Sequence, residues 1–343
     1  MVTLKYPTAS SQPEMRHALH RRRFLAGVAA MAATASSIAA TRVPTLGYIS
    51  SGVKGSPLDT LFSDAMLEGL AQQGHVVPGS MRWLTRYGNN GANDIEALTQ
   101  ELIRDGAELL MANGGATRAA IRGAAAKVPV IYGFSGDPVA AGLASSLARP
   151  LHNATGVSLM MAETNAKRIQ IVKDLVPSMR RVALISSPNH PGEAAEMEVC
   201  RRTVASLGVE MLYLPVYNST DVEVALAKAL AAKADALVAP PDPVTIATRQ
   251  RVAAWAIEQR IPFASGWAIF ADDGALMTYG PSVHWSYSRV GYLASKVLAG
   301  AKTADMPIEQ PTRFELVVNR RTARALGLTI PPVVSAGTDR FVG

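Results

Sequence analysis

Short apolar runs alternate with longer amphipathic stretches from about residue 43 onwards. Continuous apolar runs such as Glu108–Ala112 ("ELLMA") and Ala236–Ala239 ("ALVA") are typical of strands buried on both faces, and therefore of parallel sheets. Helical periodicity marks the stretches Asp94–Arg104, Thr117–Lys127, Glu193–Leu207, Val222–Ala232 and Val244–Arg260. Alternating strands and helices predict an α/β protein built from doubly wound sheets.

The pattern repeats itself after roughly 130 residues. Leu46–Gly52 ("LGYISSG") corresponds to Val182–Pro188 ("VALISSP"), and Lys127–Gly133 ("KVPVIYG") corresponds to Arg260–Gly266 ("RIPFASG"). Two further pairs keep the same order: Leu67–Val77 with Arg201–Met211, and Ala107–Gly115 with Ala234–Asp242. Such patterns are also common to α/β chains in general, but four pairs at nearly one spacing favour a duplication. We therefore predict two Rossmann-like lobes, each with a parallel sheet between helix layers.

Further elements follow the two repeats. They are a strand that runs into a linker (Leu276–Ser282), a helix (Trp285–Ala299), a Pro-containing stretch (Met306–Pro311), a strand (Phe314–Asn319) and a short helix (Arg320–Leu326). These extra elements predict that the chain crosses between the lobes more than once, through a multi-strand hinge. We expect a first lobe at 41–155 plus about 282–305, and a second lobe at 156–281 plus about 306–343.

The N-terminal segment His20–Thr41, "HRRRFLAGVAAMAATASSIAAT", has three possible interpretations: a membrane anchor, a basic nucleic-acid arm or an export signal. Its apolar part is shorter and less hydrophobic than the roughly 20 strongly apolar residues of a spanning helix. A basic, then apolar, then small-residue order is typical of a cleaved signal, and Arg21-Arg22 followed by x-Phe-Leu resembles the twin-arginine type. We expect residues 1–40 to be a signal peptide, cleaved near residue 40, and the mature protein to be periplasmic.

The leader also changes the charge balance. The whole chain carries a net charge of +7, and residues 1–40 contribute four of those positive charges. No dense basic stripe with interleaved aromatic residues remains, so we expect no nucleic-acid partner. The single cysteine, Cys200, excludes an intrachain disulfide and a Cys-based metal site, and is expected in the core. We expect no stable membrane insertion of the mature chain.

Ligands of open parallel sheets bind beyond the carboxyl ends of the strands. This rule selects a set of polar, glycine and aromatic residues as ligand-binding candidates: Ser50, Ser51, Asn113, Gly114, Gly115, Ser135, Gly136, Asp137, Asn189, Asp242, Trp267 and Tyr279. If the two lobes face each other, these residues line one cleft.

The candidate residue types fit a small zwitterion. The amides of Asn113–Gly115, at the start of a helix, offer an anion site, although the glycines also suit a simple tight turn. Asp137 and Asp242 are candidates for neutralising an ammonium group; each also precedes a proline and suits a turn or helix cap equally well. Trp267 and Tyr279 are candidates for packing against an apolar or aromatic side chain, with core packing an equal alternative for Trp267.

Catalytic machinery is not evident in the sequence. The nucleophile-elbow, zinc-protease, phosphate-loop and dinucleotide-binding motifs do not occur, and the six histidines have no metal-ligand spacing. His190 falls on an expected cleft loop, where a surface or capping role is the more common one. We expect neither enzymatic activity nor a cofactor nor a metal site.

Six segments together resemble the periplasmic substrate-binding proteins of ABC transporters, in the branch related to tryptophan- and tyrosine-binding proteins. The segments are "GYISSG", "ANGGATRAAI", "VPVIYGFSGDPVAAGLASSLARPLHNATGVS", "AETNAKRIQIVKDLVP", "TYGPS" and "PTRFELVVNRRTARALGLTIPP". The resemblance extends from about Val43 to Pro332 and implies a type I periplasmic-binding fold with three crossings and a ligand in the hinge cleft. It also implies that Asp137 lies near the ligand, and leaves Asp242 less secure.

The resemblance implies a protein that captures an amino acid or related carboxylate without transforming it. It also implies partners, namely an ABC permease and its ATPase subunits. Two alternatives remain open from the sequence: an exported enzyme of unidentified reaction, and a ligand-sensing module for a receptor.

Overall fold

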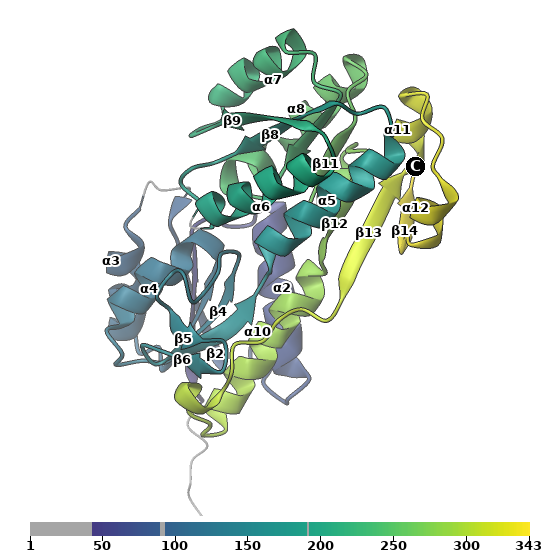
Figure 1. Cartoon of the computed structure of the whole chain (residues 1–343). Coiled ribbons are helices and arrows are strands. Elements are labelled where there is room, and N and C mark those ends of the chain that lie inside the picture. The colour runs from purple at the N-terminus through teal and green to yellow at the C-terminus, as the bar shows by residue number, and fades with distance from the viewer. Residues whose placement is uncertain (1–42, 90–92, 191) are drawn as a thin grey trace, which may run out of the picture. The chain divides into compact units, whose positions relative to one another are not determined.

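Two β-sheets, each covered by helices, organise the chain in a computed structural model (Figure 1). The structure describes residues 43–89, 93–190 and 192–343, and Val43–Gly343 form one compact unit. The expected signal peptide lies outside the described residues. None of the helices in the described part has both the length and the apolar character needed to cross a membrane.

The first lobe contains a five-stranded sheet in which all neighbouring strands are parallel. Its strands, in order across the sheet, are β2 (Arg82–Tyr87), β1 (Thr45–Ser50), β3 (Leu109–Asn113), β4 (Val130–Phe134) and β7 (Ala154–Ser158). A short hairpin, β5 (Ala144–Ser146) and β6 (Arg149–Pro150), precedes β7. The parallel order confirms the predicted architecture of this lobe.

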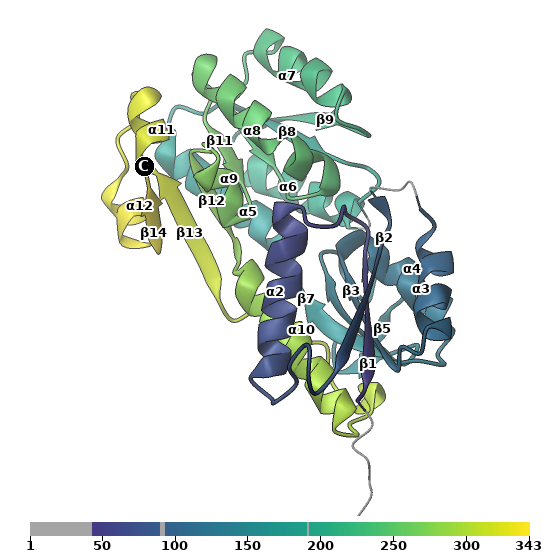
Figure 2. The same ribbon diagram turned by 180° about the vertical axis from the view of Figure 1, so that it is seen from behind.

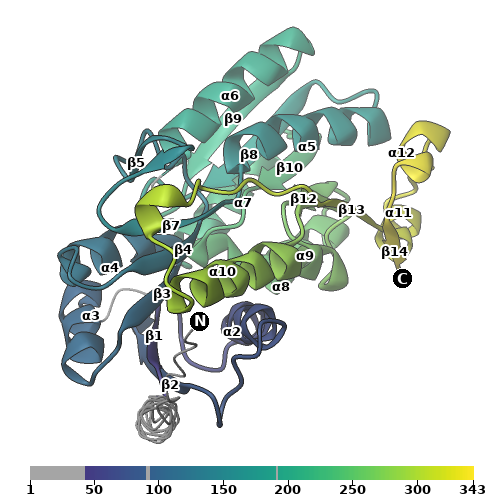
Figure 3. The same cartoon turned by 90° about the horizontal axis from the view of Figure 1, so that it is seen from below.

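Helices cover both faces of this sheet. Those on one face are α3 (Ile95–Arg104) and α4 (Thr117–Ala124), and those on the other are α2 (Pro57–Ala71) and α10 (Val283–Leu298) (Figure 3). Successive side chains of β1 alternate between the two layers: Leu46 and Tyr48 pack toward α2 and α10, whereas Ile49 packs toward α3 and α4. This alternation explains why β1 is buried along its whole length.

The second lobe contains a seven-stranded sheet. Its order is β14 (Arg340–Val342), β13 (Phe314–Asn319), β12 (Met277–Pro281), β11 (Phe263–Ser265), β10 (Ala236–Ala239), β8 (Arg181–Ser186) and β9 (Glu210–Pro215). All neighbours are parallel except β12 and β13, which run antiparallel. The sequence pattern predicted parallel sheets and did not reveal this reversal, because β13 enters the sheet from the hinge rather than through a βαβ crossover.

The helices of the second lobe also form two layers (Figures 1 and 2). They are α5 (Met161–Leu175), α6 (Glu193–Ser206), α7 (Asp221–Ala231), α8 (Pro243–Glu258), α9 (Ala268–Asp272), α11 (Arg320–Ala325) and α12 (Pro332–Ala336). Along β8, Val182 and Leu184 join the core beneath α5 and α6, whereas Ala183 and Ile185 join the core on the side of α7 and α8. Cys200 is buried in the α5–α6 layer, as predicted.

The chain passes between the two sheets three times. It leaves the first sheet after Ser158, returns between β12 and α10, and leaves again after Glu309, which bridges Val157 beside β7. Backbone hydrogen bonds tie these passages together, from Ser158 N to Glu309 O at 2.9 Å and from Ser282 N to Arg313 O at 3.0 Å. These passages form the base of the cleft.

Helices α2 and α10 lie side by side and come unusually close (Figure 2). A Cβ atom on Gly291 would lie 2.0 Å from Met66 O, and one on Gly69 would lie 2.0 Å from Ser288 O. The two helices therefore need glycine at this crossing. The contact joins the segment after β1 to the segment after the second passage, more than 200 residues later in the chain.

The helices predicted from periodicity all form, with ends within three residues of the prediction. Side chains fix several of the helix starts: the N-caps Ser56, Asp94, Asp242, Ser282 and Asn319 each accept a hydrogen bond from a backbone N–H of the first turn. These caps lie at the ends of the loops that follow the strands, and they position the residues of the cleft.

Candidate functional site

A cavity of about 520 Å³ lies where the carboxyl ends of the strands of both lobes face each other. Four aromatic side chains line it: Phe62 and Tyr287 from the helix layer of the first lobe, and Tyr217 and Trp267 from the second lobe. Phe62 stacks on Tyr287 with ring centroids 4.2 Å apart and meets Trp267 edge-on at 5.8 Å. Because Trp267 is 6% exposed, it is both a core residue and a wall of the cavity.

Most residues selected by the carboxyl-end rule line this cavity. They are Ser51, Asn113, Gly114, Gly115, Ser135, Asn189, Asp242 and Trp267. They come from loops after β1, β3, β4, β8, β10 and β11. The structure thus brings together residues that are spread over more than 200 positions of the sequence. Whether each of them contacts a ligand stays a prediction.

Four of the selected residues lie elsewhere. Ser50 is buried behind the main cavity, where it lines a smaller neighbouring cavity, and accepts hydrogen bonds from Gly52 N at 3.1 Å and Asn113 Nδ2 at 3.2 Å. The backbone of Gly136 packs against the Phe134 ring and Gly192. The Tyr279 ring stacks on Phe314, with centroids 6.0 Å apart.

Asp137 is the fourth. Its side chain is exposed and does not line the cavity. The carboxylate accepts hydrogen bonds from Val139 N at 2.8 Å and Ala140 N at 3.3 Å, which makes it an Asx-turn residue. Ser135, two positions earlier, does face the cavity. The loop therefore turns away between Ser135 and Asp137, contrary to the expectation that placed both in the cleft.

The Asn113–Gly115 segment, the predicted anion site, forms the turn before α4. Gly114 has φ +42°, which places the turn in the left-handed region that favours glycine. Gly114–Ala116 form a 3₁₀ turn that leads directly into α4. A Cβ atom on Gly115 would lie 3.4 Å from Ser51 Oγ, so the glycine leaves room between this turn and the loop after β1. Backbone N–H groups at the start of a helix, next to a serine hydroxyl, favour a carboxylate.

Asp242 lines the cavity but has a structural role as well. It is the N-cap of α8: its Oδ1 accepts from Val244 N at 2.8 Å and Thr245 N at 2.9 Å, and Thr245 Oγ1 accepts from Asp242 N, which completes a capping box. Its Oδ2 accepts from Ser187 N at 3.2 Å. Burial raises the pKa of the Asp242 carboxyl, against the opposing effect of these hydrogen bonds. Both interpretations made from the sequence, cap and cleft residue, therefore apply to its position.

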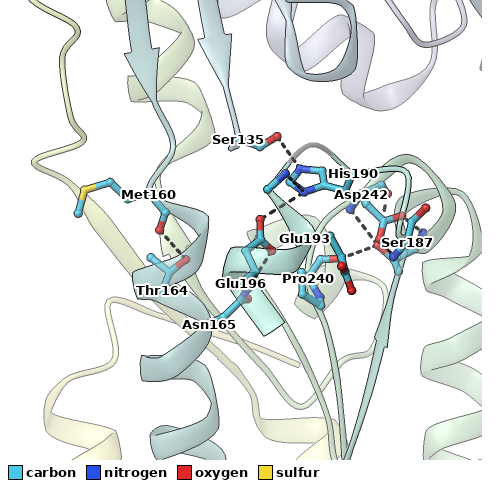
Figure 4. A network of polar contacts seen from close by, with 12 residues as sticks. Ser135, Met160, Thr164, Asn165, Ser187, His190, Glu193, Glu196, Pro240 and Asp242 are labelled. Atoms are coloured by element: carbon cyan, nitrogen blue, oxygen red, sulfur yellow. Dashed lines mark hydrogen bonds and ion pairs between the residues drawn. The ribbon is translucent and has the colours of Figure 1, made fainter. Parts of the chain in front are cut away.

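His190 lies on a loop that the sequence predicts at the cleft, with a surface or capping role as the more common one; its side chain is 8% exposed and lines the cavity. The ring lies between Ser135 Oγ, 2.7 Å from Nε2, and Glu196 Oε1, 3.2 Å from Nδ1 (Figure 4). Burial lowers the pKa of His190, but hydrogen bonding and charge from Glu196, with Asp242 and Glu193 adding to it, outweigh burial and raise it above 6.5. A direct hydrogen bond thus joins the lobes across the cleft.

Ser135, His190 and Glu196 lie in an order that resembles a nucleophile, base and carboxylate. Nδ1 of the ring lies 3.2 Å from Glu196 Oε1 and 3.3 Å from Gly192 N, so the neutral ring can carry its proton on either nitrogen, and the donor in the Ser135–His190 hydrogen bond depends on that tautomer. The protonated ring donates to Ser135 Oγ from Nε2. In every state the contact joins the lobes.

A buried polar chain continues beneath His190. Glu196 Oε2 accepts from Asn165 Nδ2 at 2.9 Å, and Asn165 Oδ1 accepts from the guanidinium of Arg168, which is fully buried. Arg168 Nε donates to Tyr279 O at 2.6 Å, next to the second passage. Burial lowers the pKa of Arg168 to about 10. One signal in the sequence could have indicated the role of Arg168. The buried stripe of α5 contains Thr164, Arg168, Val172 and Leu175, so a charged residue occupies a core position of the helix.

The arrangement as a whole can enclose and orient a small solute through contacts from both lobes. Within the described part of the chain, no group of three His, Cys, Asp or Glu side chains comes close enough to hold a metal ion. Glu196 and Arg168 do not line the cavity and support the residues that do.

Comparison with known proteins gives a consistent result. A family model for ABC transporter substrate-binding proteins matches residues 51–342. A tyrosine-binding protein of Clostridioides difficile (strain R20291) is 25% identical over 242 residues, which cover 70% of this chain and 69% of that protein.

Solved structures show the same fold. An ABC domain from Streptococcus pneumonia in complex with L-Trp superposes with a TM-score of 0.78 at 21% identity, covering 87% of this chain and 99% of that one. A ligand-free, open substrate-binding protein with adhesive properties from Clostridium difficile gives a TM-score of 0.67 at 19% identity, covering 88% and 99%.

Proposed function

The chain belongs to the family of ABC transporter substrate-binding proteins, and we propose that it captures an amino acid or a related carboxylate between its lobes and delivers it to a membrane permease. The observation that carries this proposal is the cavity of about 520 Å³, which combines an aromatic wall with a helix start suited to a carboxylate. Two relatives, one a tyrosine-binding protein and the other in complex with L-Trp, support a ligand with an aromatic side chain.

Both lobes contribute residues to the wall of the cavity, and this explains how a ligand is captured. Phe62, Ser51 and the Asn113–Gly115 turn belong to the first lobe, whereas Trp267 and Asp242 belong to the second. A ligand that touches both sets binds best when the lobes meet, so it shifts the population toward that state. A permease then distinguishes loaded from empty protein by the relative position of the lobes, and an ATPase on the far side of the membrane drives release.

This function requires a location outside the cytoplasm. The Arg21-Arg22 pair and the Ala-rich stretch after it support export by the twin-arginine route, with cleavage near residue 40. The mature protein then meets its solute in the periplasm.

The test is a thermal-shift screen of the mature protein, beginning near residue 41, with the twenty amino acids and a panel of small carboxylates. A ligand at about 100 times its Kd stabilises the folded state by about 2.7 kcal/mol, which is readily seen as a higher Tm. Isothermal titration calorimetry then gives the affinity of each compound that raises Tm. A complete absence of stabilisation by every amino acid and carboxylate tested would contradict the proposed ligand class.

A further inference from the structure

The main cavity continues into a second chamber. This chamber, called here the annex, has a volume of about 180 Å³ and shares the walls Ser51, Phe62 and Asn113 with the main cavity. Two charged residues also line it: Asp59, in the first turn of α2, and Arg249, in α8 of the second lobe. The site is therefore larger than the space bounded by the aromatic wall, and its extension carries charge.

Asp59 is a buried carboxylate held by neutral donors. Asp59 is 5% exposed, and its carboxylate accepts hydrogen bonds from Tyr48 OH at 3.1 Å and from Gly55 N at 2.9 Å. Among the described residues, no ion pair of Asp59 is found within 4.0 Å. Arg249, which also lines the annex, is engaged with Asp273 at 2.6 Å and with Ile246 O at 2.9 Å.

A buried carboxylate without a cation is costly, and proteins normally pair such a group. The charge of Asp59 acts on its surroundings: burial, and then the Asp59 carboxylate, raise the pKa of the Tyr87 phenol to about 12. Tyr48, which donates to Asp59, has its pKa raised by burial and then by the same carboxylate. An ammonium group in the annex would supply the missing positive charge.

Hydrogen bonds join Asp59 to the anion site. Asn113 Nδ2 donates to Tyr48 OH at 2.8 Å, and Tyr48 OH donates to Asp59 Oδ1 at 3.1 Å. Asn113 is also the residue that opens the Gly114-Gly115 turn before α4. An acceptor for a cation and donors for an anion are thus held by one connected network, at the junction of the two chambers. An α-amino acid carries its two charges on groups attached to one carbon atom, which matches this arrangement.

We propose that Asp59 binds the ammonium group of the ligand in the annex, while the Asn113–Gly115 turn binds its carboxylate and its side chain enters the main cavity. The proposal rests on the proposed function and narrows it to free α-amino acids with a large apolar or aromatic side chain. The exposed turn residue Asp137 does not contribute. Asp242 remains occupied by the backbone of α8 and of Ser187.

The test compares L-phenylalanine with 3-phenylpropionate, which lacks only the amino group, and repeats the comparison for tyrosine and tryptophan with their deamino analogues. Affinities are measured by calorimetry on the wild type, on Asp59→Asn and on the matched control Asp137→Asn. A charge-assisted hydrogen bond corresponds to a factor of about ten to a hundred. Wild type and Asp137→Asn should therefore prefer the amino acid by about that factor, and Asp59→Asn should lose the preference while binding the deamino analogue as before.

Each contrary outcome has its own meaning. Equal wild-type affinity for an amino acid and its deamino analogue overturns the role of Asp59 and leaves the proposed function standing. Loss of the preference in Asp137→Asn, with Asp59→Asn unchanged, overturns the assignment in favour of Asp137. If neither amino acids nor analogues bind the wild type, the ligand class of the proposed function fails and this proposal with it.

Tyr48→Phe tests the proposal if Asp59→Asn does not fold. If Asp59→Asn is unfolded by circular dichroism, Tyr48→Phe replaces it, because this change keeps the ring and removes the hydroxyl that orients Asp59. The preference for the amino acid should then fall several-fold. An unchanged preference in Tyr48→Phe, with the deamino analogue binding as in wild type, overturns the proposal.

Discussion

Ser135 Oγ lies 2.7 Å from His190 Nε2, so a hydrogen bond spans the cleft between the loop after β4 and the loop after β8. Both residues also line the cavity. The contact therefore forms only when the lobes meet, and it adds to whatever a bound ligand contributes to holding them together.

Replacing Ser135 by alanine should weaken ligand binding without unfolding the protein. A hydrogen bond of this kind contributes about 0.5–1.5 kcal/mol, which corresponds to roughly a twofold to tenfold loss of affinity. The loss should appear mainly as faster dissociation in stopped-flow measurements, because the bond forms after encounter. Ser145→Ala, which removes an exposed hydroxyl on the same lobe, is the control. Equal dissociation rates for both variants would show that the contact does not hold the lobes.

The stability of the protein should depend on pH through His190. The pKa of His190 is raised in the folded protein, because the effect of Glu196 outweighs that of burial. The contribution of His190 to the free energy of unfolding is therefore fully present below its unfolded pKa of about 6.5. That contribution is lost as the pH rises through the folded pKa. We expect the free energy of unfolding in urea to fall above pH 6.5 in wild type, and the fall to be smaller in His190→Gln.

Asp242 also makes stability depend on pH, and His284 supplies a control for the His190 measurement. Burial raises the pKa of Asp242 in the folded protein. The contribution of Asp242 to the free energy of unfolding therefore also falls with rising pH, but the fall begins near pH 3.8. Because His190 and Asp242 act on each other's pKa, the comparison of wild type with His190→Gln is made above pH 6.5, where the loss of the His190 contribution is expected. His284, an exposed imidazole 2.7 Å from Glu68, supplies the control variant His284→Gln. An identical pH profile for wild type and His190→Gln would contradict the raised pKa.

The glycine contact between α2 and α10 should be sensitive to a single methyl group. In Gly291→Ala the new Cβ would lie 2.0 Å from Met66 O, a backbone atom that moves only if the helices separate. Overpacking of this kind costs about 1–3 kcal/mol or more. Gly337→Ala is the control, because its Cβ would meet nothing closer than 3.7 Å. We expect a lower urea midpoint for Gly291→Ala alone. Since α2 carries Asp59 and Phe62, ligand affinity should fall as well.

The twin-arginine assignment concerns residues outside the described part of the chain and stays a prediction. Changing Arg21 and Arg22 together to lysine keeps the charge but removes the residue type on which the signal depends. Precursor should then accumulate in the cytoplasm and mature protein should disappear from the periplasmic fraction. N-terminal sequencing of the wild-type mature protein should begin near Thr41. Normal twin-arginine export of the double variant would contradict the assignment.

The lobes and most of the cleft could be predicted because both follow from local patterns. Parallel strands align their carboxyl ends, so the residue after each apolar run marks the edge of a sheet. Ser51, Asn113 and Trp267 were found in this way, although they come from three different loops. The repeat predicted two lobes, and one cleft was expected if the two lobes face each other.

The remaining features depend on contacts that a local pattern does not contain. Asp137 lies two residues beyond Ser135, where the chain has already turned to the surface. Asp59 looks like an ordinary acidic residue in the first turn of a helix, and only the fold places it beside Tyr48. The importance of His190 arises from the meeting of the lobes. In each case the position of a distant segment decides the role of the residue.

Arg168 and Glu196 provide a test of the buried polar chain beneath the cleft. Arg168→Met keeps much of the volume but leaves Glu196 without its nearby guanidinium and Tyr279 O without a donor. Arg168 and Glu196 are linked through Asn165 and by their charges rather than as a direct ion pair, so removing one charge should cost up to about 3–5 kcal/mol, the cost of breaking a buried pair, and removing both should cost less. The double variant Arg168→Met/Glu196→Gln should therefore be more stable than Arg168→Met alone, in a double-mutant cycle measured by urea unfolding.

Arg201→Met is the matched control for this cycle, because Arg201 forms an exposed ion pair with Glu198 on the surface of α6. This substitution should change the free energy of unfolding by less than about 0.5 kcal/mol. The cycle also reports on function, since Glu196 contacts His190 and Arg168 binds the backbone at the second passage. A folded Arg168→Met protein should close less completely around its ligand, which small-angle scattering detects as a larger radius of gyration at saturation. Additive effects of the two substitutions would show that Arg168 and Glu196 act independently, and the chain from the cleft to the hinge would then not be a single unit.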